Sequence, residues 1–218
     1  MSWDVVLFDL DGTLTDSGEG VGNGVLYALD KMGLPRPESD AELRKYLGPP
    51  LWTSFTDYAG VTDADDIAQA VVYYREYYNS TGQYENKVYE GIPELLTELN
   101  TAGKRLAVAT SKVDYSALNI LQHFNLDHHF DVIAGSDESG AERGTKALVI
   151  AHALSELKMC DGTPIVMIGD REHDIHGAKE HGLPAIGVLY GYGDHDELSA
   201  AGAFGIVSSV PELRTVLL

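Results

Sequence analysis

The sequence begins with a short apolar run that stops at two closely spaced carboxylates. Val5–Phe8 has the length and composition of a buried β-strand, and Asp9 and Asp11 follow it with a single leucine between them. Because side chains alternate along a strand, both carboxylates leave the strand end on the same side. Like charges held this close need a proton or a cation between them, and Mg²⁺ prefers such oxygen ligands. The stretch therefore predicts a buried strand with a polar, metal-competent site at its end.

Beyond residue 88 the sequence alternates between strand patterns and helix patterns. This alternation indicates a parallel sheet with helices on its faces. The expected strands are Val5–Phe8, Leu106–Ala109, Phe130–Ala134, Pro164–Ile168, Ala185–Val188 and Gly205–Val207. Helices are expected over Lys146–Leu157 and after the capping residue Ser209. The predicted fold class is α/β, with a Rossmann-like parallel sheet as the core.

Residues 17–84 carry helix patterns and no strand signal. Apolar residues recur at helical spacing over Ser17–Met32 and again over Ile67–Tyr78. Glycine and proline interrupt these patterns at 33–37 and at 48–50. The sequence thus predicts two parts, a Rossmann-like core of residues 1–16 and 85–218 and an inserted helical cap domain of residues 17–84.

The composition is strongly acidic. Fifteen Lys and Arg residues stand against 34 Asp and Glu residues, which gives a formal net charge of −19. This balance argues against nucleic-acid binding, because such proteins neutralise phosphates with a basic surface. Cys160 is the single cysteine, which excludes an internal disulfide and fits a reducing compartment. Without a basic N-terminal region or an apolar run of membrane-spanning length, the sequence predicts a cytoplasmic monomer or homodimer with no membrane partner.

Polar residues at the ends of the predicted strands supply the groups that phosphoryl transfer requires. In open parallel sheets, ligands bind outside the carboxyl ends of the strands. The residues expected there are Asp9, Asp11, Thr110, Ser111, Lys112, Asp170 and Asp174, with Lys146 at a nearby helix start. Together they offer a carboxylate nucleophile, a carboxylate for proton transfer, a hydroxyl, a lysine and further carboxylates for a metal ion.

Four segments resemble the signature motifs of the haloacid-dehalogenase-like superfamily of aspartyl-phosphate phosphatases. They are Asp9–Ser17, the strand that ends in Thr110, Arg143–Lys146, and Gly169–Asp170 followed by Asp174. Ser111 replaces the asparagine often found at its position. Residues 17–84 stand where the subclass I helical cap is inserted, so the resemblance covers nearly the whole chain. The segments Gly48–Leu51, Ala109–Lys112 and Gly191–Gly193 favour the phosphoglycolate-phosphatase-like branch.

The resemblance implies hydrolysis of a small phosphate ester, such as phosphoglycolate, by the core as catalytic domain. Asp9 would attack phosphorus and form a transient aspartyl phosphate. Asp11 would protonate the leaving alkoxide and then deprotonate the hydrolytic water.

The resemblance also implies Mg²⁺ as the cofactor. Asp9, the main-chain carbonyl of Asp11, and Asp170 would hold the ion, with Asp174 in support. The phosphoryl oxygens would be bound by Thr110 and Lys146, with assistance from Ser111 and Lys112.

Several related activities stay open at this point. A 5′-nucleotidase, a pyrophosphatase or a sugar phosphomutase of the same superfamily would carry the same four motifs. A binding module without catalysis would have lost one of these residues, and none is lost.

Within the predicted cap, Arg44 and Lys45 are candidates to bind a second anionic group of the substrate. Closure of the cap would bring this basic pair near the substrate and exclude water from the phosphoryl group. The alternative is a pair of solvated helix residues, which is the usual position of charged side chains. If the pair does bind substrate, acidic phosphate esters are favoured over neutral sugar phosphates.

Overall fold

The computed structural model describes residues 3–49, 51–138, 141–160 and 162–218. Met1 and Ser2 of the N-terminal segment and Pro50 of the Gly48–Leu51 motif lie outside the described residues. The chain forms two compact units, one containing the residues up to Thr15 together with Val88–Leu218, the other Asp16–Lys87. Each unit has its own buried apolar core.

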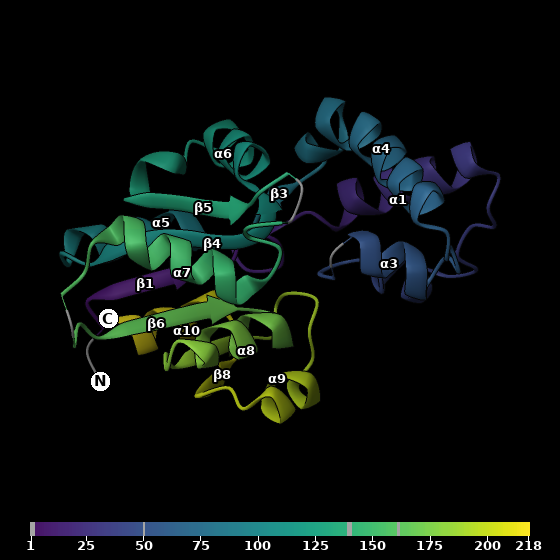
Figure 1. Ribbon diagram of the computed structural model, residues 1–218. Helices are drawn as coiled ribbons and strands as arrows, with labels where there is room; N and C mark the ends of the chain where they lie inside the picture. The colour runs from purple at the N-terminus through teal and green to yellow at the C-terminus, as the bar shows by residue number, and fades with distance from the viewer. Residues whose placement is uncertain (1–2, 50, 139–140, 161) are drawn as a thin grey trace. The chain divides into compact units, whose positions relative to one another are not determined.

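A six-stranded sheet with paired parallel strands forms the centre of the first unit (Figure 1). This arrangement confirms the predicted α/β fold class. The strand order is β5-β4-β1-β6-β7-β8. The strands are β1 (Val5–Phe8), β4 (Arg105–Val113), β5 (Val132–Ser136), β6 (Ile165–Gly169), β7 (Ala185–Val188) and β8 (Gly205–Val207). The first strand of the chain is therefore an interior strand, and all of its residues are buried because helices cover both faces.

Helices cover the two faces of this sheet in two groups. They are α5 (Ile92–Thr101), α6 (Asp114–His123), α7 (Lys146–Leu157), α8 (Glu172–Glu180), α9 (His195–Ala201) and α10 (Val210–Leu217), with the short 3₁₀-helix η2 (Asp127–His129). On one face Val6 and Phe8 of β1 pack in a cluster with residues of α5, α6 and α10. Val5 and Leu7 of the same strand pack with residues of α7, α8 and α9 on the other face. The alternation of side chains along β1 thus assigns each group of helices to a face.

Strands β4 and β5 differ most from their predicted bounds, and β6 (Ile165–Gly169) is displaced by one residue from the predicted Pro164–Ile168. β4 runs to Val113, beyond the predicted end at Ala109, and its register against β5 shifts between these two residues. β5 begins at Val132, because Phe130 instead terminates the preceding 3₁₀-helix. In β4 and β5 the backbone pairing extends beyond the apolar segment, because polar residues continue the strand past the core.

The secondary structure of the described residues in the second unit consists of helices and of the strand residues at its two ends. Its helices are α1 (Gly18–Met32), α2 (Asp40–Arg44), α3 (Leu51–Asp57), α4 (Ala64–Ser80) and the 3₁₀-helix η1 (Gly82–Tyr84). Residues of α1, α3 and α4 form its core, in which the rings of Tyr74 and Tyr78 stack at 5.2 Å. Two short strands, β2 (Thr15–Asp16) and β3 (Lys87–Val88), pair where the chain passes between the units. Helix α2 ends at Arg44, before the glycine and proline interruption at 48–50.

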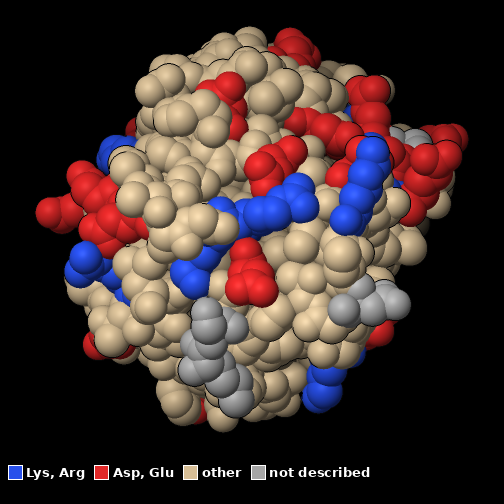
Figure 2. Space-filling view, turned by 90° about the vertical axis from the view of Figure 1, so that its left-hand side faces the viewer, with Lys and Arg blue, Asp and Glu red and all other residues tan. Residues whose placement is uncertain are grey.

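The acidic and basic side chains are interspersed on the face of the molecule drawn in Figure 2. The net charge of −19 is therefore not gathered into one patch on this face.

Among the described residues, no helix combines the length and the apolar character that crossing a bilayer requires.

Candidate active site

Three buried aspartates meet at the carboxyl ends of β1 and β6. Asp9 follows β1, Asp170 follows β6, and Asp174 lies in the first turn of α8. One carboxylate oxygen from each lies within 4.8 Å of the others. Asp9 and Asp170 come together because β1 and β6 pair in register, with Phe8 beside Ile168. The strand order turns at β1, which is where open α/β sheets bind their ligands.

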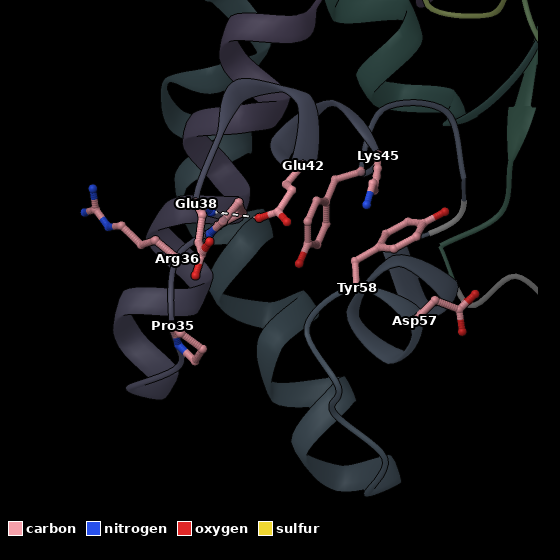
Figure 3. Close-up of a pocket in the computed structure, with 9 residues that line it drawn as sticks. Pro35, Arg36, Glu38, Glu42, Lys45, Asp57 and Tyr58 are labelled. Atoms are coloured by element: carbon pink, nitrogen blue, oxygen red, sulfur yellow. Dashed lines mark hydrogen bonds between the residues drawn. The ribbon is translucent and has the colours of Figure 1, made fainter.

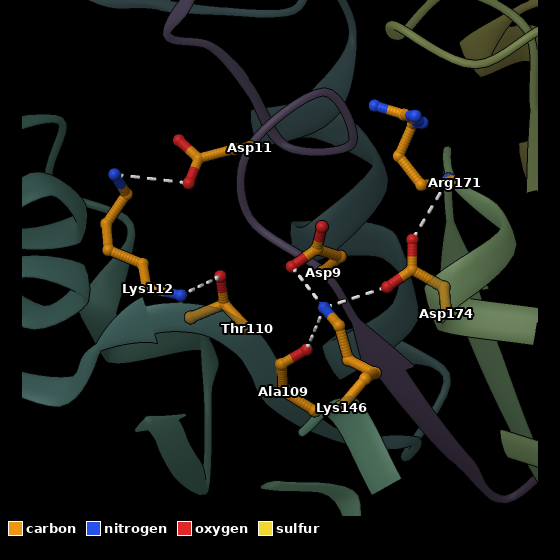
Figure 4. Close-up of polar contacts among 8 residues, drawn as sticks. All are labelled: Asp9, Asp11, Ala109, Thr110, Lys112, Lys146, Arg171 and Asp174. Atoms are coloured by element: carbon orange, nitrogen blue, oxygen red, sulfur yellow. Dashed lines mark hydrogen bonds and ion pairs between the residues drawn. The ribbon is translucent and has the colours of Figure 1, made fainter. Parts of the chain in front are cut away.

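Lys146 binds two of these carboxylates from the start of α7 (Figure 4). Its Nζ donates to Asp9 Oδ1 at 2.7 Å and to the carbonyl oxygen of Ala109 at 3.0 Å, and it lies 2.8 Å from Asp174 Oδ1. Burial acts to lower the pKa of Lys146, but Asp174 and Asp9 outweigh it and raise that pKa. The buried ammonium therefore stays charged and fixes both carboxylates.

Lys146 pairs with Asp9 and Asp174 but not with Asp170, which leaves negative charge in the cluster uncompensated. Burial raises the pKa of Asp9 to about 6, with Lys146 opposing the shift and Asp174 adding to it. Burial, followed by the charges of Asp174 and Asp9, also raises the pKa of Asp170 well above its usual value. A bound divalent cation would favour the ionised form of both groups.

The oxygens that remain available fit a small, hard cation. Asp170 Oδ1 is buried and has no hydrogen-bond partner among the described residues, whereas its Oδ2 accepts the N–H of Tyr192 at 2.7 Å. Asp174 has both oxygens engaged, since Lys146 contacts Oδ1 and the N–H of Arg171 donates to Oδ2 at 3.1 Å. Asp9 and Asp170 are therefore the better candidates for direct ligands, and Asp174 supports the site through its partners. An all-oxygen set with two carboxylates suits Mg²⁺.

Asp11 lies apart from the three aspartates, beside Lys112 (Figure 4). Its Oδ2 is 3.2 Å from Lys112 Nζ, and its Oδ1 is buried without a hydrogen-bond partner in the described part of the chain. The turn after Asp11 depends on Gly12, which has φ +80°, and a Cβ there would overlap Asp170 Oδ2. Asp9 and Asp11 therefore have different partners, Lys146 for Asp9 and Lys112 for Asp11, which allows them different roles.

The remaining predicted residues divide between the two units. Thr110 is buried in β4, and its hydroxyl accepts the N–H of Lys112 at 3.2 Å, while Ser111 is exposed. Arg44 ends α2 and Lys45 is its C-terminal cap, and both are exposed in the second unit. The role of this basic pair in substrate binding stays a prediction.

Lys45 lines a hollow of about 440 Å³ in the second unit (Figure 3). The other charged residues around it are Arg36, Glu38, Glu42 and Asp57. Carboxylates outnumber cations in this lining, so the hollow itself does not favour an anion.

Sequence reasoning missed the contribution of the segment after β7. The hydroxyl of Tyr190 donates to the carbonyl oxygen of Thr13 at 3.1 Å, and its ring contacts Tyr89 edge-on at 4.9 Å. Burial raises the pKa of Tyr190, so its hydroxyl stays protonated as a donor. The available signal was its place after a predicted parallel strand, on the same edge of the sheet as Asp9.

Mg²⁺ is expected to stabilise the protein more at about pH 7.5 than at about pH 5. The pKa of Asp9 is raised from 3.8 to about 6, so the native state holds this proton more tightly than the unfolded state. The stability of the metal-free protein therefore falls as the pH rises from 3.8 to about 6. Above this range Asp9 is ionised and can bind the metal ion. The measurement is the Tm in EDTA and in excess Mg²⁺ at both pH values, at matched ionic strength. An equal or larger gain in Tm from Mg²⁺ at the lower pH would contradict the assignment of Asp9 to the metal site.

Comparison with known proteins agrees with this geometry. The family model described as haloacid dehalogenase-like hydrolase matches residues 6–188. The sequence is 43% identical over 212 residues to a 5′-nucleotidase of Pseudomonas aeruginosa, covering 97% of this chain and 94% of that protein. It is 40% identical over 215 residues to the tyrosine-protein kinase PtkA of Mycobacterium tuberculosis, covering 98% and 72% respectively. A phosphoglycolate phosphatase of Vibrio vulnificus is 28% identical over 222 residues, covering 98% and 96%.

A solved structure shows the same fold. The crystal structure of a protein described as a predicted phosphatase, from Clostridium acetobutylicum, matches with a TM-score of 0.93 and 45% sequence identity. The match covers 99% of this chain and 98% of that one. The family model and this structure confirm the resemblance carried by the four motifs: the chain belongs to the haloacid dehalogenase-like hydrolases.

Proposed function

We propose that the protein is a Mg²⁺-dependent phosphatase that hydrolyses a small organic phosphate monoester through an aspartyl phosphate on Asp9. The observation that carries this proposal is the cluster of Asp9, Asp170 and Lys146 at the carboxyl end of β1. The family membership and the phosphatases among the similar proteins support it.

In the proposed reaction Asp9 is the nucleophile. Lys146 occupies Oδ1 of Asp9, which leaves Oδ2 to attack phosphorus. The new bond joins this oxygen to phosphorus as the bond to the substrate alkoxide breaks. Mg²⁺ bound by Asp9, Asp170 and the carbonyl of Asp11 would offset the charge of the phosphoryl oxygens.

Asp11 is proposed to move the protons. It gives one proton to the leaving alkoxide and afterwards takes one from the water that hydrolyses the aspartyl phosphate. Its contact with Lys112 holds the side chain at the edge of the site, away from Asp9. Thr110, buried beside them, offers its hydroxyl to a phosphoryl oxygen.

Lys146 is proposed to act mainly on the carboxylates. Its ammonium already contacts Asp9, Asp174 and the carbonyl of Ala109, so direct binding of a phosphoryl oxygen requires release of one of these contacts. Holding Asp9 in its attacking position is the role that needs no rearrangement.

The proposed substrates are small phosphate esters, with phosphoglycolate as the first choice from the motifs. Nucleoside 5′-monophosphates are a second candidate class, favoured by the 43% identity to the 5′-nucleotidase of Pseudomonas aeruginosa. The proposed location is the cytoplasm, and the single cysteine, Cys160, supports a reducing compartment. The proposed oligomeric state is a monomer or a homodimer.

The decisive experiment is a panel of phosphate compounds assayed for phosphate release in Mg²⁺ and in EDTA. The panel contains phosphoglycolate, nucleoside 5′-monophosphates, pyrophosphate and neutral sugar phosphates. Release that depends on Mg²⁺ is expected, and undiminished release in EDTA would contradict the proposal. Isomerisation of a sugar phosphate without phosphate release would instead indicate a mutase. Transfer from ATP to protein tyrosine, prompted by the similarity to PtkA, would indicate a kinase.

Arg44→Ala and Lys45→Ala are expected to raise KM for phosphoglycolate about tenfold, equivalent to about 1.4 kcal/mol, and to leave KM for a neutral sugar phosphate unchanged. The physical reason is the loss of a cation opposite the substrate's second anionic group. Arg36→Ala is the control, because Arg36 is an exposed cation of the same unit that pairs with Asp30. An unchanged preference for acidic esters in both variants would remove this basic pair from substrate selection.

A further inference from the structure

We propose that residues 191–197 form a brace that positions Asp170 and Asp174 for Mg²⁺ binding, with Gly191 and Glu197 as its positioning residues. The inference rests on the proposed metal-dependent function. The brace consists of the loop after β7 and the first turn of α9, and neither Gly191 nor Glu197 is itself a candidate metal ligand.

The loop part of the brace orients Asp170. The N–H of Tyr192 donates to Asp170 Oδ2 at 2.7 Å, which leaves the buried Oδ1 as the oxygen available to a cation. A Cβ on Gly191 would lie 2.5 Å from Cβ of Asp170 and would overlap the carbonyl oxygen of Gly12. A Cβ on Gly193 would overlap the carbonyl oxygen of Asp170. The loop therefore approaches Asp170 this closely only because glycine flanks Tyr192 on both sides.

The helical part of the brace fixes the two residues that follow Asp170. Oε1 of Glu197 accepts Nε–H of Arg171 at 2.7 Å and the N–H of Glu172 at 2.9 Å. The N–H of Arg171 in turn donates to Asp174 Oδ2 at 3.1 Å. Glu197 thus holds the backbone between the two aspartates, and the contact with Arg171 is largely shielded, at 20% and 21% exposure of the side chains.

Glu197 is itself held in place by the start of its helix. Asp194 caps α9 by accepting the N–H of Glu197 at 2.8 Å. One short segment consequently supports Asp170 through its loop and Asp174 through its helix. Because Mg²⁺ demands near-ideal octahedral geometry, residues that orient its carboxylate ligands affect metal affinity without touching the ion.

The test of the brace is to measure Mg²⁺ binding by titration calorimetry in the absence of substrate. Glu197→Ala and Gly191→Ala are each expected to weaken Mg²⁺ binding about tenfold or more. At saturating Mg²⁺ the KM for the phosphate ester is expected to stay near the wild-type value, because neither residue is proposed to contact substrate. Glu197→Gln keeps an oxygen acceptor and is expected to recover part of the affinity lost in Glu197→Ala.

Matched controls come from the same fold. Glu212 occupies the position in α10 that Glu197 has in α9, third after the capping residue, and its carboxylate accepts a local backbone N–H, from Ser208 at 2.8 Å. A Cβ on Gly205 would lie 4.0 Å from its nearest neighbour, the side chain of Ile186, so alanine fits there. Glu212→Ala and Gly205→Ala are expected to bind Mg²⁺ as the wild type does.

The outcomes separate this inference from the proposed function. Wild-type protein that binds no Mg²⁺ would overturn both. Wild-type binding with unchanged affinity in folded Glu197→Ala would overturn the brace alone, and this variant decides the matter if Gly191→Ala does not fold. If Glu212→Ala and Gly205→Ala weaken Mg²⁺ binding as much as the brace variants do, the cause is a general loss of stability, and the brace is overturned.

Discussion

Replacing Asp9 with asparagine is expected to reduce phosphatase turnover by roughly 10⁴-fold or more and to abolish the covalent phosphoenzyme. The amide has nearly the size of the carboxylate but is not a nucleophile toward phosphorus. Its oxygen can still accept the hydrogen bond from Lys146, and the variant no longer carries the buried negative charge of Asp9, the group whose pKa burial raises to about 6. The Tm of the metal-free variant is therefore expected to equal or exceed that of the wild type.

The measurements are steady-state turnover, trapping of the phosphoenzyme by acid quench, and a thermal melt. Asp131→Asn is the matched control, because Asp131 pairs with Arg105 at the opposite end of β4 and is 45% exposed. Substantial turnover by purified, folded Asp9→Asn protein would remove Asp9 as the nucleophile.

Replacing Asp170 with asparagine is expected to raise the Mg²⁺ concentration needed for half-maximal activity by about 100-fold or more. Asp170 offers the buried oxygen that has no protein partner among the described residues, and Mg²⁺ sites of this kind rely on one or two carboxylates. Neighbouring side chains cannot replace the carboxylate charge that Asp170→Asn removes from so small a set of ligands. EDTA is expected to abolish the activity of the wild-type enzyme, and added Mg²⁺ is expected to restore that activity.

Asp174→Asn provides the comparison for this second result. Both oxygens of Asp174 are already bound, by Lys146 and by the N–H of Arg171, so its loss is expected to affect the Mg²⁺ requirement less than the loss of Asp170. The two variants are compared by Mg²⁺ titration of the rate at saturating substrate. A larger effect at Asp174 than at Asp170 would reverse the assignment of the direct ligand.

The charges of the site explain why dependence on a metal ion is expected to be strong. In the described part of the chain, the four carboxylates of the site face two ammonium groups, those of Lys112 and Lys146. The carboxylates are those of Asp9, Asp11, Asp170 and Asp174. Both ammonium groups are already paired with carboxylates, in a protein whose net charge is −19. A divalent cation offsets this excess of negative charge, which would otherwise repel an approaching phosphate ester.

Much of the fold and part of the site follow from local patterns in the sequence. Helix α7 has the predicted bounds, Lys146–Leu157, because its capping residue and apolar spacing are both local features. Polar residues after predicted parallel strands were expected to share one edge of the sheet, and Asp9 and Asp170 do so. The chemical class of the site was therefore readable from residue types and their positions after strands.

The sequence by itself determined the α/β class, and it predicted the helical insertion and the candidate residues for chemistry, because strand alternation, helix periodicity and turn residues act over a few neighbouring positions. Only the tertiary structure decided which oxygens are occupied and which are open. Lys146 reaches Asp9 across 137 positions of sequence, and Glu197 reaches Arg171 across 26. Such contacts depend on strand order and helix packing, which no local pattern specifies. For this reason Asp170 and Asp174 look alike in sequence, while the structure gives their oxygens different partners.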